Sequence, residues 1–358
     1  MKFIHAADTH LDSPLRGLEC YEGAPLEAIR GATRRAFTRM VDLALDEAVD
    51  FVLLAGDLYD GDWKDYNTGL YFTRQMQRLA EAGIRVFVVA GNHDAASQIT
   101  RVLRPPPNVT VFASQQPETV LLEPLGAAIH GQGFATASVR DNLAAGFPAR
   151  RAGLFNIGLL HTSLDGRPGH ADYAPCGVDT LRAHGYDYWA LGHVHAREVV
   201  SEAPWIVFPG NLQGRHARET GSKGCTLVTV AGGTVRAVEH RDVTDLRWER
   251  LPVDLSGLQH MHEVYARIEQ ALGTALASAE DRLVAVRLQL GGATALHARL
   301  HSRRDELLNQ CRALAPQVGG DALWLEKVRL RYLADIPLQR VGMLPAALAS
   351  PSTPIRHA

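Results

Sequence analysis

The sequence lacks three features that would place it in a specialised class of protein. No apolar run reaches the about 18–20 residues that a membrane-spanning helix needs, and the first residues lack the charged-then-apolar order of a secretion signal. The four cysteines stand far apart and form no C-x-x-C pair, which is typical of free thiols in a reducing compartment. We therefore expect a cytoplasmic protein with no disulfide framework and no membrane partner.

Strong positive charge is also missing. Lysine and arginine number 37 against 39 acidic residues, a formal net charge of −2. A strongly basic balance would have indicated nucleic acid by itself, so nucleic-acid binding here would depend on local arginine clusters or on bound metal ions. Hydrophobic residues make up 46% of the 358 residues, enough to build one large domain and a smaller one.

Five short apolar runs, each of which predicts a buried strand, end directly in polar residues. The runs are Phe3–Ala7, Phe51–Ala55, Val86–Ala90, Ile157–Leu160 and Tyr188–Leu191. The polar residues that follow them are Asp8 and His10; Asp57; Asn92, His93 and Asp94; His161; and His193 and His195. Because ligands bind at the carboxyl ends of strands in open α/β sheets, we expect these side chains at one rim. A single such group is usually an ordinary buried polar residue, but five in register argue against that interpretation.

Imidazole and carboxylate ligands of this kind suit a pair of divalent metal ions. Asp57 is the natural bridge, since a carboxylate has two oxygens to share. Two ions held roughly 3.5–4 Å apart can generate hydroxide, orient a phosphate and stabilise the attacking and leaving oxygens. The residues therefore predict a two-metal phosphoesterase, with Mn²⁺ as the first choice and Fe²⁺, Zn²⁺ or Mg²⁺ as alternatives.

These motifs resemble the calcineurin-like metallophosphoesterase superfamily, over roughly residues 1–245. The resemblance implies that one metal is held by Asp8, His10, Asp57 and His195, and a second by Asp57, Asn92, His161 and His193. It also implies that His93 donates a proton to the leaving oxygen while Asp94 holds the His93 ring.

Three further segments resemble the bacterial SbcD-like and YhaO-like DNA exonuclease branch of this superfamily: residues 3–12, 56–60 and 208–216. That resemblance implies a Mn²⁺-dependent DNA exonuclease or endonuclease that processes DNA ends in repair with an ATPase partner of the SbcC or YhaN kind. It also implies a homodimer, joined through helices at Asn67–Ala82 and Ala96–Leu103. The alternative is a small-molecule phosphodiesterase, of the cyclic-nucleotide type, or a phosphatase, and the low positive charge favours this alternative.

Three residues are candidates for contact with the substrate. Arg215 can bind a phosphate oxygen with a planar fork that lysine lacks, and His216 follows it; a role in stabilising the loop is the alternative for both. Asp60 stands where archaeal and eukaryotic relatives often carry a second active-site histidine. A carboxylate cannot donate to a phosphate at neutral pH, so we interpret Asp60 as a marker of the bacterial branch.

The fold class predicted is α/β, with a two-sheet αββα sandwich over residues 1–250, a small α/β capping domain over 254–333 and a flexible Pro/Ala-rich tail over 334–358. Helices are expected at Arg30–Ala48 and Asn67–Ala82. In the capping domain we expect a helix from Met261 to Leu276, a strand at Val284–Leu290, a helix from Leu296 to Leu314 and a strand at Val328–Tyr332. If the polar faces of those strands look toward the metals, Arg287, Arg329 and Arg331 would form a track for a phosphate backbone.

Overall fold

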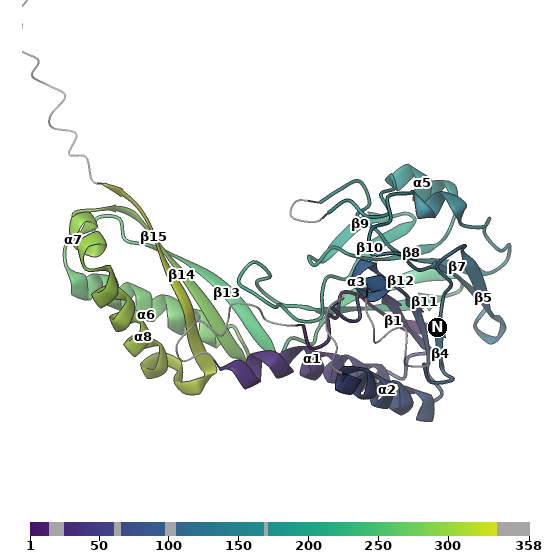
Figure 1. The fold of residues 1–358 in the computed structure, drawn as a ribbon, viewed down its shortest axis with the longest axis horizontal. Coiled ribbons are helices and arrows are strands. Elements are labelled where there is room, and N and C mark those ends of the chain that lie inside the picture. The colour runs from purple at the N-terminus through teal and green to yellow at the C-terminus, as the bar shows by residue number, and fades with distance from the viewer. Residues whose placement is uncertain (14–24, 61–65, 97–104, 168–170, 335–358) are drawn as a thin grey trace, which may run out of the picture.

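The computed structural model describes residues 1–13, 25–60, 66–96, 105–167 and 171–334 (Figure 1). Its strands form two six-stranded sheets, which stack on one another at one end of the molecule, and a three-stranded sheet at the other end. No helix in the described ranges is long and apolar enough to cross a membrane.

The first large sheet has the order β12-β11-β1-β2-β3-β4. Its central strands pair in parallel, and both faces of the sheet are covered, which explains their near-continuous apolar sequences. Strands β11 and β12 form an antiparallel hairpin at one edge. The bounds are β1 Lys2–Ala6, β2 Phe51–Ala55, β3 Arg85–Val89, β4 Val109–Val111, β11 Gly224–Ala231 and β12 Thr234–Asp242.

The second large sheet has the order β5-β6-β7-β8-β10-β9. Strands β6, β7, β8 and β10 run parallel to one another, and the two edge strands run antiparallel to their neighbours. The bounds are β5 Glu118–Leu122, β6 Ala127–Gln132, β7 Phe155–His161, β8 Tyr188–Gly192, β9 Glu198–Glu202 and β10 Trp205–Phe208. The sequence did not predict β6 and β9, because a histidine and a glycine interrupt β6 and no residue of β9 is buried.

Helices cover the outer face of each large sheet and confirm the predicted αββα sandwich. Helices α1 (Leu26–Asp46) and α2 (Tyr66–Glu81) pack on the first sheet, while α5 (Val178–Ala183) packs on the second. A separate apolar core, with Phe51 and Tyr188 among its members, fills the space between the sheets. The short helix α3 spans Asn92–Ala96.

The apolar side chains of α2 lie almost entirely in the core. Phe72, Met76 and Leu79 are buried, and Leu70 is left 51% exposed. The second stretch expected in a homodimer, residues 96–103, lies almost wholly outside the described residues.

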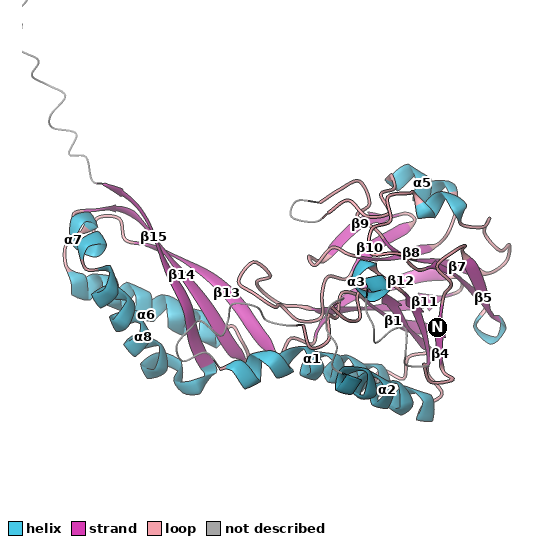
Figure 2. Ribbon diagram, in the orientation of Figure 1, coloured by secondary structure: helices cyan, strands magenta, loops and turns pink. Residues whose placement is uncertain are grey.

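The third sheet has the order β13-β14-β15, with all three strands parallel. Its helices α6, α7 and α8 all lie on one face of the sheet (Figure 2). The sheet begins at Leu246, so residues 246–250, which the sequence analysis placed with the sandwich, pair with β14. The single helix expected from Leu296 to Leu314 is two helices that meet at Arg303. The bounds are β13 Leu246–Asp254, α6 Met261–Ala277, β14 Leu283–Thr294, α7 His297–Ser302, α8 Arg304–Gly319 and β15 Leu323–Ala334.

Helix α1 joins the sandwich to the third sheet (Figure 1). Its first turns bury Ile29 and Ala32 against Trp248 and Trp324, which lie on the sheet face opposite α6 and α8. The two indole rings meet edge to face, with centroids 6.0 Å apart. The remainder of α1 packs on the first large sheet, so one rigid element fixes the place of the third sheet.

Trp324→Ala tests this junction. Removing a buried indole leaves a cavity and should lower the free energy of unfolding by about 3–5 kcal/mol, measured by urea denaturation. Leu70→Ala removes an exposed apolar side chain and should change stability by less than about 0.5 kcal/mol. Equal effects of the two substitutions would contradict the packing described for α1.

Candidate metal centre

The seven predicted metal ligands meet at the carboxyl ends of strands from both large sheets. Asp8 and His10 follow β1, Asp57 follows β2 and Asn92 opens α3 after β3. His161 ends β7, and His193 and His195 follow β8. Parallel pairing brings these strand ends to one edge of each sheet, and stacking of the sheets brings the two edges together.

The backbone at this edge is held in an uncommon conformation. Asp8, His10, Asp57 and His193 all have positive φ angles, of 50°, 41°, 54° and 101°. Non-glycine residues seldom adopt this conformation, and its cost of order 1–3 kcal/mol each must be met by surrounding contacts. Hydrogen bonds from Asp8 N to Gly56 O and from His10 N to Asp57 O, both 3.0 Å long, provide such contacts.

Gly192 allows the two sheets to meet closely here. A Cβ atom at this position would lie 1.8 Å from the carbonyl oxygen of Ala55, well inside the contact distance of the two atoms. A glycine is therefore needed where the end of β8 approaches the end of β2.

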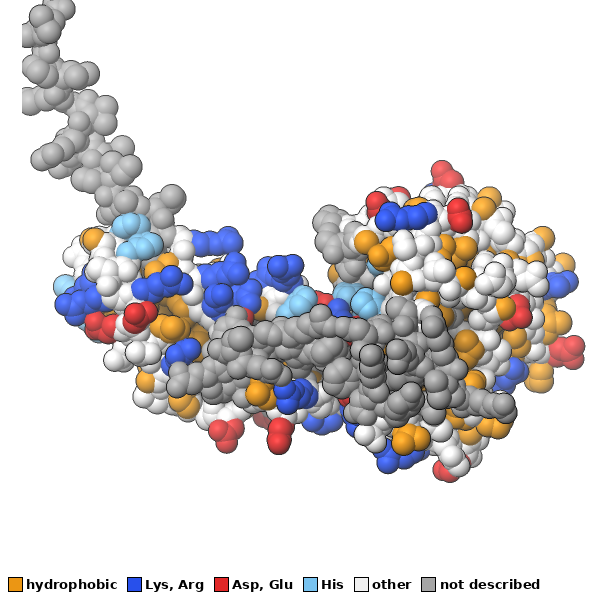
Figure 3. Space-filling view, viewed as in Figure 1, with side chains coloured by type: hydrophobic (Ala, Val, Ile, Leu, Met, Phe, Trp, Pro, Cys, Tyr) orange, Lys and Arg blue, Asp and Glu red, His pale blue; other side chains and the backbone are white. Residues whose placement is uncertain are grey.

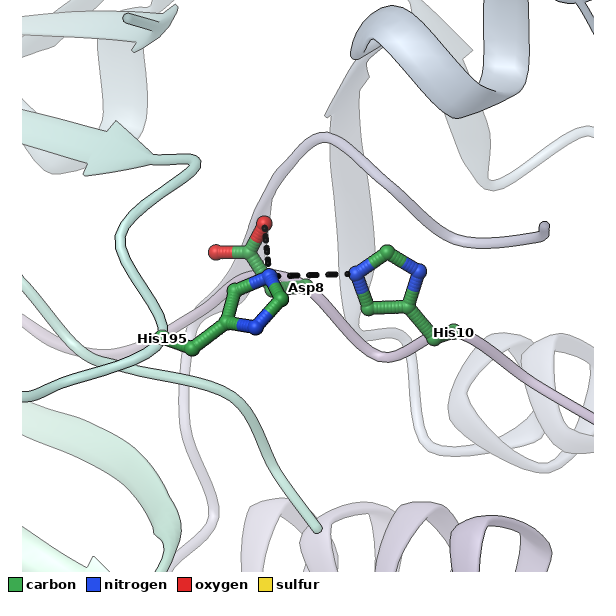
Figure 4. Close-up of side chains that lie close together, drawn as sticks. All are labelled: Asp8, His10 and His195. Carbon is green, nitrogen blue, oxygen red and sulfur yellow. Dashed lines mark hydrogen bonds and ion pairs between the residues drawn. The ribbon is translucent and has the colours of Figure 1, made fainter. Parts of the chain in front are cut away.

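Asp8, His10 and His195 form the first group of candidate ligands (Figure 4). The Nε2 atoms of the two imidazoles lie 3.3 Å apart, and His195 Nε2 lies 3.8 Å from Asp8 Oδ1. His10 Nδ1 lies 2.7 Å from Asp60 Oδ1, and His195 Nδ1 lies 2.7 Å from Glu219 Oε1. In neutral imidazoles both Nδ1 atoms then donate, so both Nε2 atoms present lone pairs to each other. Two lone pairs at this distance repel unless a cation lies between them, so the donor set fits a metal ion.

The second group is built around His161. Its Nδ1 donates to the carbonyl of Ala55 at 2.9 Å, which turns the Nε2 lone pair toward Asn92 Oδ1 at 3.1 Å and Asp57 Oδ2 at 3.6 Å. The His193 ring lies beside it, with centroids 5.2 Å apart. His193 Nε2 donates to the carbonyl of Ala171, which leaves Nδ1 as the atom able to bind a metal.

Asp57 lies between the two groups. Its Oδ2 atom is 3.6 Å from Nε2 of His161 and 3.9 Å from Nε2 of His10. Its Oδ1 atom accepts a hydrogen bond from the backbone N–H of His93 at 2.9 Å. A carboxylate that bridges two metal ions would have to lie in such a position, between the two ligand groups.

Burial and mutual repulsion perturb the titration of these groups. Burial, followed by the charge of Asp57, raises the pKa of Asp8 well above its usual value, and the same two causes raise the pKa of Asp94 to about 7. Burial also raises the pKa of Asp57. Burial, assisted by Arg215, lowers the pKa of His10 well below 6.5, so this imidazole is neutral, as a metal ligand must be.

His93 and Asp94 do not have the relation expected from the sequence. The carboxylate of Asp94 accepts hydrogen bonds from the backbone N–H groups of Leu58, Tyr59 and Gly91. It braces the loops after β2 and β3 and is 3% exposed. Among the described residues, the carboxylate that lies against the His93 ring belongs to Asp60, whose Oδ1 lies 3.3 Å from Nδ1 of that ring.

Asp60 lies beneath the site rather than on its surface. It is 8% exposed and holds His10, the hydroxyl of Ser13 and the His93 ring. Burial alone would raise the pKa of Asp60, but hydrogen bonds from His10 and Ser13 hold it below its usual value. The geometry suits a group that orients histidines, and it does not present Asp60 for contact with a substrate.

Arg215 and His216 lie in the loop after β10. The side chain of Arg215 is 16% exposed, and its Nη1 lies 3.7 Å from Asp60 Oδ1. Its Nε is buried and has no hydrogen-bond partner among the described residues. His216 is 52% exposed at the rim, where its Nε2 lies 3.8 Å from Glu219 Oε1.

Glu219 is the residue of the site that sequence reasoning missed. It is 8% exposed and contacts His195 and Arg215. The available signal was that Glu219 is the one acidic residue between Pro209 and Lys223, in a segment with two arginines, a histidine and a lysine.

Comparison with known proteins agrees with this architecture. The sequence pattern of the calcineurin-like phosphoesterases matches residues 1–197, and that of the middle domain of the metallophosphoesterase YhaO matches residues 248–332. The second match covers most of the third sheet and its helices, so both parts of the molecule have known counterparts.

Individual relatives cover a similar range. The chain is 38% identical over 273 residues to a Bacillus subtilis protein called "Uncharacterized metallophosphoesterase YhaO", covering 75% of this chain and 67% of that protein. It is 24% and 27% identical to the DNA double-strand break repair protein Mre11 of Sulfurisphaera tokodaii and Haloferax volcanii, covering 64% and 84% of this chain and 60% and 64% of theirs. A dimetal phosphatase from Danio rerio is similar in structure, with a TM-score of 0.40 and 12% identity, over 65% of this chain and 93% of that one. The chain thus spans about two thirds of the length of its sequence relatives.

The family match covers more than half of the chain, and the candidate metal ligands lie within it. The chain belongs to the calcineurin-like phosphoesterase family, a family of metal-dependent hydrolases.

Proposed function

We propose that the protein is a two-metal phosphodiesterase that processes DNA ends, with Mn²⁺ as its metal. One observation supports this reaction class. The Nε2 atoms of His10 and His195 face each other at 3.3 Å, and Asp57 lies between the two ligand groups. Divalent ions held by such ligands lower the pKa of water and neutralise charge on a phosphate. Oxygen and imidazole donors suit Mn²⁺, Fe²⁺ and Zn²⁺, so the choice of Mn²⁺ is part of the proposal.

Two side chains would act on the substrate. The His93 ring is 42% exposed at the mouth of the site and is oriented by Asp60, a suitable position for giving a proton to the departing sugar oxygen. Arg215 lies beside Asp60 and His195, where its guanidinium can bind a non-bridging phosphate oxygen.

The open face of the third sheet supports DNA as the substrate. Arg250 pairs in register with Arg287, and Arg329 pairs with Gln289, on the face opposite the buried Leu288 and the helices. Arg250 also donates to the carbonyl of Ala217, in the loop that carries Arg215. Basic side chains gather on this part of the molecule and continue toward histidines at the hollow of the sandwich (Figure 3).

A small-molecule phosphodiesterase or phosphatase is the second candidate, and the net charge of −2 favours it. The basic face argues for a polyanion, because a small phosphate ester that reaches the metal centre has no need of arginines on the third sheet. Backbone phosphates do need such contacts, without reading sequence.

The proposal includes an ATPase partner of the SbcC or YhaN kind, which follows from the resemblance to the repair nucleases, and a cytoplasmic location. It also includes a homodimer, for which the exposed Leu70 on α2 is the support that the described residues offer.

A substrate panel with Mn²⁺ tests the proposal. Linear duplex DNA, single-stranded DNA, cyclic AMP and a phosphopeptide are offered to the wild type and to Asp57→Asn, which removes the bridging charge. We expect DNA hydrolysis by the wild type and none by the variant. Hydrolysis of cyclic AMP or the phosphopeptide alone would favour the second candidate, and an unchanged rate in Asp57→Asn would refute the two-metal mechanism.

The double substitution Arg329→Gln, Arg331→Gln tests the DNA surface. Each lost phosphate contact should lower the salt slope of duplex affinity by about 0.9, while hydrolysis of a chromogenic diester stays unchanged. Arg303→Gln, Arg304→Gln removes two arginines near the helices of the same unit and serves as the matched control. A slope that falls equally in both variants would place the DNA elsewhere.

His93→Ala tests the proton donor. The variant should still bind metal but lose about 10²–10⁴-fold in turnover of a dinucleotide, because its alkoxide leaving group needs a proton. A nitrophenyl ester, whose leaving group is acidic, should lose much less. Equal losses on the two substrates, measured by steady-state kinetics, would rule out His93 as the acid.

Metal binding should stabilise the protein in a pH-dependent manner. Folding raises the pKa of Asp94 from 3.8 to about 7, so the metal-free fold holds this proton more tightly than the unfolded chain does. That contribution to stability is lost as the pH rises from about 4 to about 7. Mn²⁺ competes with protons for the carboxylate cluster, so its effect on the melting temperature should be larger at about pH 7.5 than at about pH 5.5. A stabilisation independent of pH, or one retained in full by Asp57→Asn, would contradict this account.

A further inference from the structure

The carboxylate of Glu219 has hydrogen-bond partners at both oxygens. Oε1 accepts from Nδ1 of His195 at 2.7 Å and from Nη2 of Arg215 at 3.2 Å. Oε2 accepts from Nδ2 of Asn211 at 3.0 Å and from the backbone N–H of Arg215 at 2.8 Å. All four partners are donors, so the carboxylate cannot rotate without leaving a buried donor unpaired.

This arrangement fixes the His195 ring. A carboxylate at Nδ1 keeps the proton on that atom and leaves the Nε2 lone pair directed at Asp8 and His10. Without Glu219, Nδ1 would have no acceptor in this position, and the proton could move to Nε2, the atom needed for the metal.

The loop that carries Glu219 is clamped by the first strand of the third sheet. Nε1 of Trp248 donates to the carbonyl of Gly214 at 3.0 Å, and the N–H of Gly221 donates to the carbonyl of Trp248 at 3.0 Å. The side-chain oxygen of Gln213 accepts from the N–H groups of Asp245 and Leu246. The loop backbone is therefore tied to β13 on both sides of Glu219.

We propose that Glu219 is a positioning residue that fixes the tautomer and orientation of His195 and holds Arg215 at the rim of the metal centre. This proposal rests on the proposed pair of metal ions, but it concerns metal binding alone and requires no knowledge of the substrate. An outer carboxylate of this kind is commonly worth about 10–100-fold in metal affinity. Because His195 belongs to the first ligand group, removing Glu219 should weaken the affinity for one of the two ions.

The test is a Mn²⁺ titration of the metal-free protein. Calorimetry measures the affinity and number of bound ions, and electron paramagnetic resonance monitors their coupling. We expect the wild type to bind two ions and to show the signal of a coupled pair. Glu219→Ala should weaken one ion by about 10–100-fold and leave the other unchanged, so that a mononuclear signal appears at intermediate Mn²⁺. Glu219→Gln keeps one acceptor oxygen and should give a smaller loss, and it remains informative if the alanine variant does not fold.

Glu198→Ala is the matched control. Glu198 also pairs with an arginine, Arg167, through both oxygens, but it lies on β9 and Arg167 is not a candidate ligand. The Glu198→Ala variant should bind Mn²⁺ as the wild type does. Two unchanged ions in both Glu219 variants would overturn the proposal, as would equal weakening of both ions. A wild type that binds no Mn²⁺ would instead refute the proposed function, so the two failures are distinguishable.

Discussion

The structure depends on a group of acidic side chains that burial forces together. Asp8 and Asp57 offer oxygen atoms to one cluster with His161, all within 4.8 Å of one another, and the two carboxylates are 1% and 2% exposed. Burial raises the pKa of both carboxyls, and the charge of Asp57 raises that of Asp8 further, because like charges repel strongly in a medium of low dielectric. Backbone hydrogen bonds such as those from Asp8 N to Gly56 O and from His10 N to Asp57 O hold this arrangement and offset the cost of the positive φ angles there. Positive charge supplied by metal ions relieves the repulsion, and that is the physical reason to expect the ions.

The sandwich supplies this arrangement through its topology. Strands β1, β2 and β3 run parallel in one sheet, and β7 and β8 run parallel in the other. Each sheet therefore presents its loops at one edge, and stacking places the two edges together. Each candidate ligand lies at the end of a strand or within four residues beyond it, so the strand restricts its position. The candidate ligands are consequently positioned by the ends of regular structure, as a preorganised site requires.

Much of this could be predicted from the sequence, because the information was local. Apolar runs of four or five residues predicted the central strands, and the polar residues directly after them predicted which side chains would meet. The sequence did not indicate which distant segments would come into contact. Asp60 approaches His93 across 33 residues and Glu219 approaches His195 across 24, and no spacing rule connects either pair. Strand β13 was missed because its residues alternate between two partners: Trp248 faces α1, whereas Val253 faces the helices of the third sheet.

Direct contacts connect the third sheet to the candidate metal centre. Helix α1 packs on both the first large sheet and the third sheet, and the loop that follows β10 is bonded to β13 on one side and to His195 on the other. Any displacement of the third sheet must either break these contacts or move Glu219, and Glu219 contacts His195, a candidate metal ligand. The basic face of the same sheet is reached from this loop through Arg250. Under the proposed function, a polyanion bound on that face would contact the same strand, β13, that holds the loop carrying Glu219.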